Sequence, residues 1–224
     1  DHNVISSDLK NKGFTVFILD SKSNAFSQIA DDLKDMNNIS SIHVFSHGNS
    51  GILEIGNGIV TVNDLQNNQA NLNIIGSKLK QGGDILLYGC DVAAGEAGQK
   101  FINALSQMTH ANVAASIDET GAQSLGGNWI LEVQAGSVHT NAVALDNWQH
   151  TMLLGGTDLS NFSTNLFANL SLSEVNSLTT SQIQGLLSSQ ISSINPSSLT
   201  GLTSTQIQSI SSASIGYLTS SQLN

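Results

Sequence analysis

The stretch SIHVFSHGNSG (41–51) passes from an apolar run directly into His47 and Gly48. A second run, GDILLYGC (83–90), ends in the same way on Cys90, the only cysteine of the chain. Short runs of β-branched, aromatic and aliphatic residues are typical of strands, and the unbroken second run indicates burial on both faces. The sequence therefore predicts two buried strands, each followed at once by a chemically reactive side chain.

Strand and helix patterns alternate up to about residue 150. Apolar runs predict strands at Phe14–Asp20, Ser41–Ser46, Asp84–Gly89 and Asn112–Ser116. Amphipathic patterns predict helices at Asn24–Met36 and Ala94–Met108. Asn57-Gly58 predicts a hairpin within Gly51–Val62, and two further runs predict a closing hairpin over Asn128–Val143. Since strands separated by helices form parallel sheets, we expect an α/β domain with a mostly parallel sheet flanked by helices.

His47 and Cys90 are predicted to lie at one edge of this sheet, because functional groups gather beyond the carboxyl ends of parallel strands. A thiol attacks as its thiolate, and a neighbouring imidazole can take the proton. The backbone N–H groups of Gly48 and Cys90 are the expected donors to an oxyanion. The alternative is purely structural, since a lone cysteine is often a small buried hydrophobe and a lone histidine a polar surface or core residue.

Longer motifs give the sequence a family resemblance. IHVFSHG (42–48) followed by ILLYGC (85–90) resembles the caspase-like cysteine peptidases of clan CD. Residues 13–150 are also similar to a caspase-like domain of very large, repeat-rich, adhesin-like surface proteins of bacteria. The motifs that carry this second likeness are SHGNSGILEIGN, LLYGCDVAAGEAG, VAASIDETG and GGNWILEVQAG.

The resemblance implies a cysteine endopeptidase without a cofactor, in which His47 is the general base or acid and Cys90 the nucleophile. Its substrate would be a polypeptide, either the parent chain or a neighbouring surface protein. Its location would be secreted or at the cell surface of a bacterium. Relatives usually carry one more strand before the first helix, and this chain starts at Asp1 without it, so we expect the first strand of the domain to be missing or to lie upstream in a parent protein.

The stretch SIDETG (116–121) follows the predicted strand after the cysteine. In several members of the clan, an acidic residue in this region lines the pocket for the residue before the scissile bond. The resemblance thus implies that Asp118 binds substrate and selects a basic side chain. The alternative is that Asp118 forms a turn by side-chain hydrogen bonding. The other histidines lack the spacing of metal ligands, so no metal site is expected.

Composition argues against two classes of partner. The net charge is −10, and all seven basic residues precede Phe101, whereas nucleic acids and anionic membranes require basic patches. No apolar run approaches the roughly 18 residues of a membrane span. The chain starts at Asp1 with neither an initiator Met nor a signal peptide, so we expect it to be part of a longer protein.

The chain changes character at LLGGTD (153–158), which is predicted to be a Gly-rich hinge between a domain over residues 1–152 and a tail over residues 159–224. Apolar residues of the tail recur in pairs three positions apart with a period of eight, from Leu159 and Phe162 to Ile215 and Leu218, and Leu223 opens a further octad. Eight residues advance about 80° beyond two turns of an α-helix, so each octad must break and restart.

Helix-capping residues occupy the breaks. The capping box, in which an N-cap Ser or Thr is followed three residues later by Glu or Gln, fits Ser171–Glu174, Thr179–Gln182, Thr203–Gln206 and Thr219–Gln222. Asn195 precedes Pro196, which suits the first helical position, whereas Leu187 breaks the pattern. We predict a solenoid of single helical turns that continues in the parent protein. The alternative is a low-complexity Ser/Thr linker.

Two functional classes remain open. One is a cysteine endopeptidase, and the other is a catalytically silent module that presents or anchors the repeat array. The His47–Cys90 pair favours the peptidase, although an intact pair does not prove turnover. The sequence leaves open the scissile bond, any activator, the choice between cis and trans cleavage, and the oligomeric state.

Overall fold

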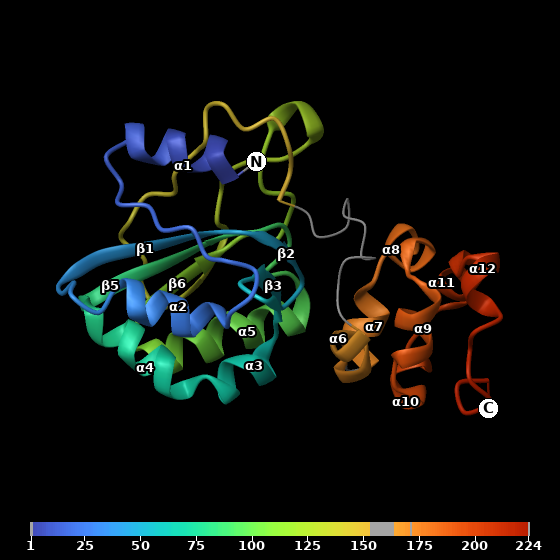
Figure 1. Ribbon diagram of the computed structural model, residues 1–224. Helices are drawn as coiled ribbons and strands as arrows, with labels where there is room; N and C mark the ends of the chain where they lie inside the picture. The colour runs from blue at the N-terminus through green and yellow to red at the C-terminus, as the bar shows by residue number, and fades with distance from the viewer. Residues whose placement is uncertain (1, 153–163, 171, 224) are drawn as a thin grey trace. The chain divides into compact units, whose positions relative to one another are not determined.

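The computed structural model describes residues 2–152, 164–170 and 172–223. The chain divides into two compact units, Asp1–Leu154 and Gly155–Asn224 (Figure 1). The hinge predicted at 153–158 and the first predicted apolar pair of the tail lie outside the described residues.

The first unit is built on a four-stranded sheet with the order β1-β5-β6-β7 (Figure 1). β1 (Ile39–Phe45), β5 (Leu79–Tyr88) and β6 (Asn112–Ala115) run parallel, and β7 (Val133–Ala135) joins them antiparallel. Helices connect the parallel strands, as parallel pairing requires. The predicted α/β fold with a mostly parallel sheet flanked by helices is confirmed.

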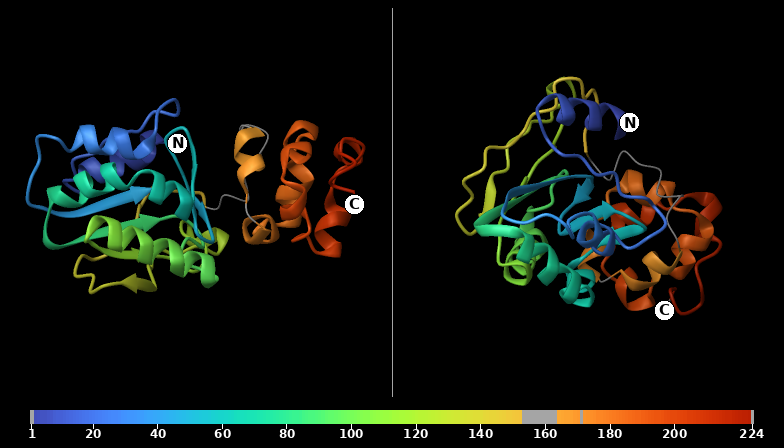
Figure 2. Two further views of the ribbon diagram at one scale, coloured as in Figure 1. Left: turned by 90° about the horizontal axis from the view of Figure 1, so that it is seen from below. Right: turned by 60° about the vertical axis from the view of Figure 1, so that its left-hand side comes forward.

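The two faces of the sheet are covered differently (Figures 1 and 2). One face is covered by the helices α2 (Ala25–Asp32), α3 (Val62–Asn67), α4 (Gln69–Lys78) and α5 (Gly95–Thr109). On the other face lie α1 (His2–Asn11) and the long loops around β7, one of which contains the short 3₁₀-helix η1 (Gln123–Leu125). None of the helices in the described part of the chain is long and apolar enough to cross a membrane.

The central strand β5 is buried on both faces, as its sequence predicted. Ile85 and Leu87 pack in the core beneath the helices, whereas Leu86 and Tyr88 pack on the loop-covered face. All four side chains are at most 4 % exposed. This alternation follows from the two-residue period of a strand.

A small antiparallel sheet follows β1 directly. It contains β2 (His47–Asn49), β3 (Ile52–Ile55) and β4 (Gly58–Val60). The hairpin predicted at Asn57-Gly58 is confirmed, since Ile55 pairs with Gly58 across the turn. The strand β2 adds His47 to this sheet, which the sequence did not predict.

The strand predicted at Phe14–Asp20 is wrong. This segment forms no ladder with β1, which is therefore an edge strand of the main sheet. Side-chain packing holds the segment instead: the Phe14 ring meets His43 edge-on at 5.1 Å between ring centroids, and Phe17 and Ile18 are 45 % and 56 % exposed. The segment thus packs beside β1 without joining the ladder of the sheet.

The closing hairpin predicted over Asn128–Val143 is also wrong, because only β7 forms within it. The second half of the expected hairpin gives its N–H groups to side chains. Asp84 accepts hydrogen bonds from the backbone of His139 and Thr140, and the Tyr88 hydroxyl accepts one from Val143. Buried acceptors from β5 thus replace a partner strand.

The second unit consists of short helices in its described part. They are α6 (Thr164–Asn169), α7 (Leu172–Ser177), α8 (Thr180–Gly185), α9 (Ser188–Ser193), α10 (Pro196–Leu199), α11 (Ser204–Ser209) and α12 (Ser212–Ile215). The capping boxes at Thr179 and Thr203 and the Asn195-Pro196 start are confirmed. Although Leu187 supplies no cap, its N–H still donates to Gln190 Oε1 at 2.8 Å.

Each of these helices packs against the helix three places along the chain. The pairs are α6 with α9, α7 with α10, α8 with α11, and α9 with α12. Buried polar side chains form hydrogen bonds over a similar separation along the chain. Gln206 Nε2 donates to the carbonyls of Asn176 and Leu178, and Ser214 Oγ donates to that of Leu186. These bonds satisfy carbonyls that the ends of short helices leave without a partner.

The helix packing accounts for the unequal burial of the first apolar residue in four octads. Ile183 and Ile191 are at most 1 % exposed, whereas Ile207 and Ile215 are 48 % and 49 % exposed. Ile183 in α8 is covered by α11, but the described chain has no helix three places beyond α11 or α12. These positions are equivalent in the sequence pattern but differ in burial because of the packing.

We expect Ile183→Asp to destabilise the second unit by several kcal/mol, because it buries a charge without a partner. Ile207→Asp makes the same change at a half-exposed position and should alter the free energy of unfolding by about 0.5 kcal/mol or less. Hydrogen exchange measured by mass spectrometry over α8 and α11 tests both. Equal loss of protection in the two variants would contradict the packing.

Candidate active site

The parallel pairing of β1 with β5 brings the two reactive residues to the same edge. Phe45 is in register with Tyr88, and His47 and Cys90 each follow two positions later. Ser46 continues the pairing, since its N–H donates to the carbonyl of Tyr88 at 3.1 Å. The two chains therefore leave the sheet side by side.

The exits are so close that glycine is required at Gly48. A Cβ at this position would lie 2.6 Å from Val92 Cγ2 and 3.0 Å from the Cys90 carbonyl oxygen. It would also lie 3.1 Å from Gly89 Cα. Backbone packs directly on backbone here, which only a residue without a side chain allows.

The N–H groups of Gly48 and Cys90 converge on one acceptor. Both donate to the carbonyl oxygen of Met152, at 3.0 Å from Gly48 and 3.3 Å from Cys90. These are the two donors expected from the sequence, and the structure brings them together. Their acceptor is a backbone carbonyl of the same chain.

The segment that carries this carbonyl lies as an extended strand across the site. Met152 N–H donates to the Thr120 carbonyl at 2.7 Å, and Ala122 N–H donates to the His150 carbonyl at 2.9 Å. Between them Thr151 forms an antiparallel bridge with Gly121. Residues 150–152 thus pair with residues 120–122.

The side chain of Met152 fills an apolar pocket. It is 2 % exposed and packs in one cluster with Leu9, Leu145, Trp148 and Cys90. The pocket is therefore formed by α1, by the loop after β7 and by the turn after β5. Such a pocket suits an uncharged side chain of this size.

The thiol of Cys90 is fully buried and bonded to Thr120. It accepts a hydrogen bond from Thr120 N–H at 3.1 Å and lies 3.5 Å from the Thr120 carbonyl, to which it donates. Burial raises the pKa of the thiol to about 12, although the Thr120 N–H lowers it in part. The neighbouring Asp91 has φ = 60°, a conformation that is uncommon outside glycine.

His47 is half-buried. Its backbone is in register with that of Glu54 on the neighbouring strand of the hairpin. Among the described residues, His47 Nδ1 and Glu54 Oε2 are both buried without a hydrogen bond, and none joins His47 to the Cys90 thiol. Burial raises the pKa of Glu54, which the nearby His47 lowers in part. A bond from Nδ1–H to Glu54 would satisfy both atoms and fix the ring orientation.

Asp118 lies beside the turn of Cys90, but its carboxylate is used locally. It accepts hydrogen bonds from Asn128 Nδ2 and from Ser116 Oγ, and the residue is exposed. The carbonyl of Asp118 accepts a bond from Asp91 N–H at 3.0 Å. The substrate interpretation and the turn interpretation of SIDETG both stay predictions.

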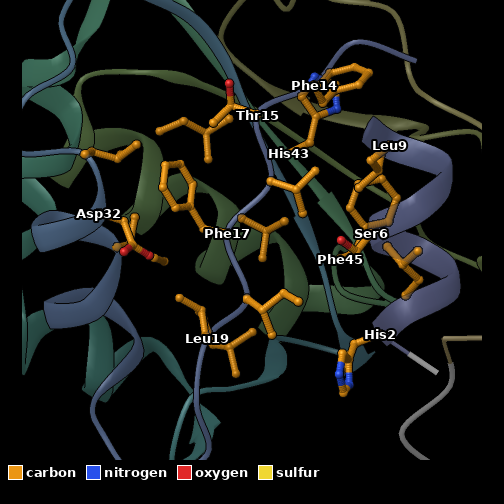
Figure 3. Close-up of a pocket in the computed structure, with 18 of the residues that line it drawn as sticks. His2, Ser6, Leu9, Phe14, Thr15, Phe17, Leu19, Asp32, His43 and Phe45 are labelled. Carbon is orange, nitrogen blue, oxygen red and sulfur yellow. The ribbon is translucent and has the colours of Figure 1, made fainter. Parts of the chain in front are cut away.

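A cavity of about 510 Å³ lies elsewhere, at the free edge of β1. Residues of α1, α2, β1 and the extended segment 14–19 line it, as Figure 3 shows for Phe14, His43 and Phe45 among others. Neither His47 nor Cys90 lines this cavity. Within the described chain, no group of three or more His, Cys, Asp and Glu side chains is placed to hold a metal ion.

Comparison with known proteins assigns a family to the first unit. Residues 1–152 match the family described as Domain of unknown function (DUF4347). The chain belongs to the DUF4347 family. No curated protein and no solved structure is significantly similar to it.

Three residues of this DUF4347 domain that build the site were not found from the sequence. Thr120 binds the thiol, Glu54 faces the imidazole, and Met152 occupies the two N–H donors. Thr120 and Glu54 belong to motifs that the sequence analysis quoted, so a position near the site could have been inferred for both. Met152 carries no motif, and only the tertiary structure reveals it.

We expect native Cys90 to be alkylated by iodoacetamide more slowly than the same thiol in the urea-unfolded chain. Its pKa is raised, so the thiolate fraction at mildly alkaline pH is lower than that of an ordinary thiol with a pKa of 9.0. The native rate should keep increasing with pH as the pH approaches about 12. Mass spectrometry of the alkylated chain measures both rates, and equal rates would show an open thiol.

Proposed function

We propose that this DUF4347 domain is a caspase-like cysteine endopeptidase that cleaves a polypeptide in the parent chain or in a neighbouring protein. The observation that carries the proposal is the convergence of the Gly48 and Cys90 N–H groups on one carbonyl oxygen. Two fixed N–H donors beside a thiol, one of them from the cysteine itself, form the arrangement that stabilises the oxyanion of acyl transfer. A cysteine that only fills space in the core would not require two N–H donors beside its thiol.

In the proposed reaction, the Cys90 sulfur attacks the carbonyl carbon of the scissile bond. His47 takes the thiol proton and passes it to the leaving amine, while Gly48 and Cys90 hold the oxyanion. Water then hydrolyses the thioester. In the proposed reaction the thiol exchanges its hydrogen bonds to Thr120 for contact with the His47 ring.

The catalytically silent module remains the second candidate. The observation in its favour is the thiol itself, which is fully buried, has a raised pKa and makes its hydrogen bonds to Thr120 instead of His47. The two candidates differ in one measurable property, because only the peptidase produces new chain ends that depend on Cys90.

We propose that the second unit is part of a repeat array that the parent protein presents. We infer a solenoid with three octads per turn, supported by helices that pack three places apart and by Gln and Ser side chains that bond across the same step. An array of this kind suits a secreted or cell-surface bacterial protein.

We expect the full chain to show cleavage that depends on both Cys90 and His47. Cys90→Ala should abolish new termini, and His47→Ala should slow their formation by roughly 10²–10⁴-fold, the usual contribution of a general base. His139→Ala is the matched control, because His139 is exposed and uses only its backbone N–H near the core. Intact-mass and N-terminal sequencing identify the products.

A combinatorial peptide library extends this test to cleavage in trans. Because residues 150–152 cover the site, the library is also given to a variant in which His150→Gly, Thr151→Ser and Met152→Gly open it. If neither the chain itself nor the library yields a Cys90-dependent terminus with either protein, the domain is a silent module.

Gly48→Ala tests the two oxyanion donors separately from the His47–Cys90 pair. The added Cβ would meet Val92 and the Cys90 backbone, so the Gly48 N–H must move away from the carbonyl. Loss of one such donor should slow cleavage by roughly 10²–10³-fold. Gly58→Ala is the control, since nothing lies within 4 Å of its Cβ position. Equal rates for the two variants would remove Gly48 from the site.

A further inference from the structure

The strand His150–Met152 is held in the site as a substrate is held. It pairs antiparallel with residues 120–122 through bonds of 2.7 Å and 2.9 Å, and its last carbonyl oxygen receives both oxyanion donors. A reacting group bound in this way is already oriented for attack, and orientation supplies much of the rate of an acyl transfer.

The nucleophile and this carbonyl share one anchor. The Cys90 thiol lies 3.5 Å from the Thr120 carbonyl oxygen, and that oxygen also accepts the Met152 N–H at 2.7 Å. Met152 and Cys90 belong to the same buried cluster. The sulfur is therefore next to the residue whose carbonyl occupies the two N–H donors.

A set of buried acceptors leads the chain to this point. Asp84 binds the N–H groups of residues 139 and 140, and the Tyr88 hydroxyl binds that of Val143. Asp8 in α1 binds the backbone N–H of Asn147 at 3.0 Å and its Nδ2 at 2.6 Å. These three acceptors are at most 5 % exposed. The tethers fix the path of residues 139–147 and so deliver residues 150–152 to the site.

We propose that the peptide bond after Met152, which joins it to Leu153, is the bond that Cys90 cleaves, and that the cleavage occurs in cis. This inference rests on the proposed peptidase function. It assigns the residue before the scissile bond to an apolar pocket, so the preference is for an uncharged side chain of the size of Met. Asp118 then takes no part in substrate binding.

The chemistry balances without a further reagent. A bond forms between Cys90 Sγ and the Met152 carbonyl carbon, and the C–N bond to Leu153 breaks. The thiol proton passes through His47 to the leaving nitrogen, which becomes the amino terminus of the released segment. One water then adds to the thioester, which returns the thiol and leaves a carboxyl group on Met152.

The cut falls two residues before the boundary between the two units and at the end of the region that matches the family. Cleavage at this position separates residues 1–152, the whole region that matches the DUF4347 family, from residues 153–224, which carry the repeat helices. The new carboxylate of Met152 remains beside the Gly48 and Cys90 donors. The cleaved domain is thereby occupied by its own product, which favours a single turnover over repeated cleavage of other proteins.

The full chain is the substrate for the test. Wild type should yield the fragments Asp1–Met152 and Leu153–Asn224, identified by intact mass and N-terminal sequencing, and Cys90→Ala should yield neither. Met152→Leu should keep cleavage within about tenfold, because the volume and polarity are similar. Met152→Lys should reduce it by roughly 10²-fold or more, because the pocket would have to bury a charge. Gln149→Lys adds the same charge at the exposed position just before this strand and should have no effect.

A second variant guards against misfolding of Met152→Lys. A Gly-Ser-Gly insertion between Met152 and Leu153 leaves residues 2–152 unchanged, and the cut should remain directly after Met152. Cys90-dependent cleavage at another bond, or only of a peptide library, would overturn this assignment and leave the peptidase function intact. Cleavage after Met152 that persists in Cys90→Ala would overturn it as well. Absence of any Cys90-dependent cleavage, including by the variant with the opened site, would overturn the peptidase function.

Discussion

The site depends on the parallel pairing of β1 with β5. Because Phe45 stands opposite Tyr88, the chain leaves both strands at the same level and in the same direction. Beyond the two strand ends, backbone packs directly on backbone. Gly48 lies against Gly89 and the Cys90 carbonyl with no room for a Cβ. A shift of one residue in this register would move a reactive side chain to the other face of the sheet. The long apolar run of β5 is buried on both faces.

This dependence explains which parts of the site the sequence could predict. His47, Gly48 and Cys90 are each adjacent to a strand end, so a local pattern and one rule of parallel sheets placed them together. Met152 is brought to them by hydrogen bonds that Asp8, Asp84, Tyr88 and Thr120 accept, and these acceptors lie in three separate parts of the chain. No local pattern encodes such a path. The same acceptors account for the missing hairpin after β7, whose N–H groups they satisfy.

The repeat helices show the same division between local and long-range information. Helix starts at Thr179, Asn195 and Thr203 were predictable because a cap depends only on the next three residues. The step of three helices was not predictable, because the octad period fixes where each helix breaks but not the angle at which the next begins. The unequal burial of Ile183 and Ile207 is a direct consequence of that step.

The raised pKa of Cys90 and the proposed role of the thiol as a nucleophile are two properties of one arrangement. The strand 150–152 covers the sulfur, and burial then raises the pKa to about 12 and keeps the thiol protonated at neutral pH. A protonated, covered thiol resists alkylation and oxidation by molecules from solution. It can still react with the carbonyl that covers it, provided that the proton leaves during the attack. His47 Nδ1 and Glu54 Oε2 are both buried without a hydrogen bond among the described residues, and in the proposed reaction the thiol exchanges Thr120 for the imidazole. In the proposed reaction the strand 150–152 is both the substrate and the group that covers the thiol, so protection of the thiol and its reactivity need not conflict.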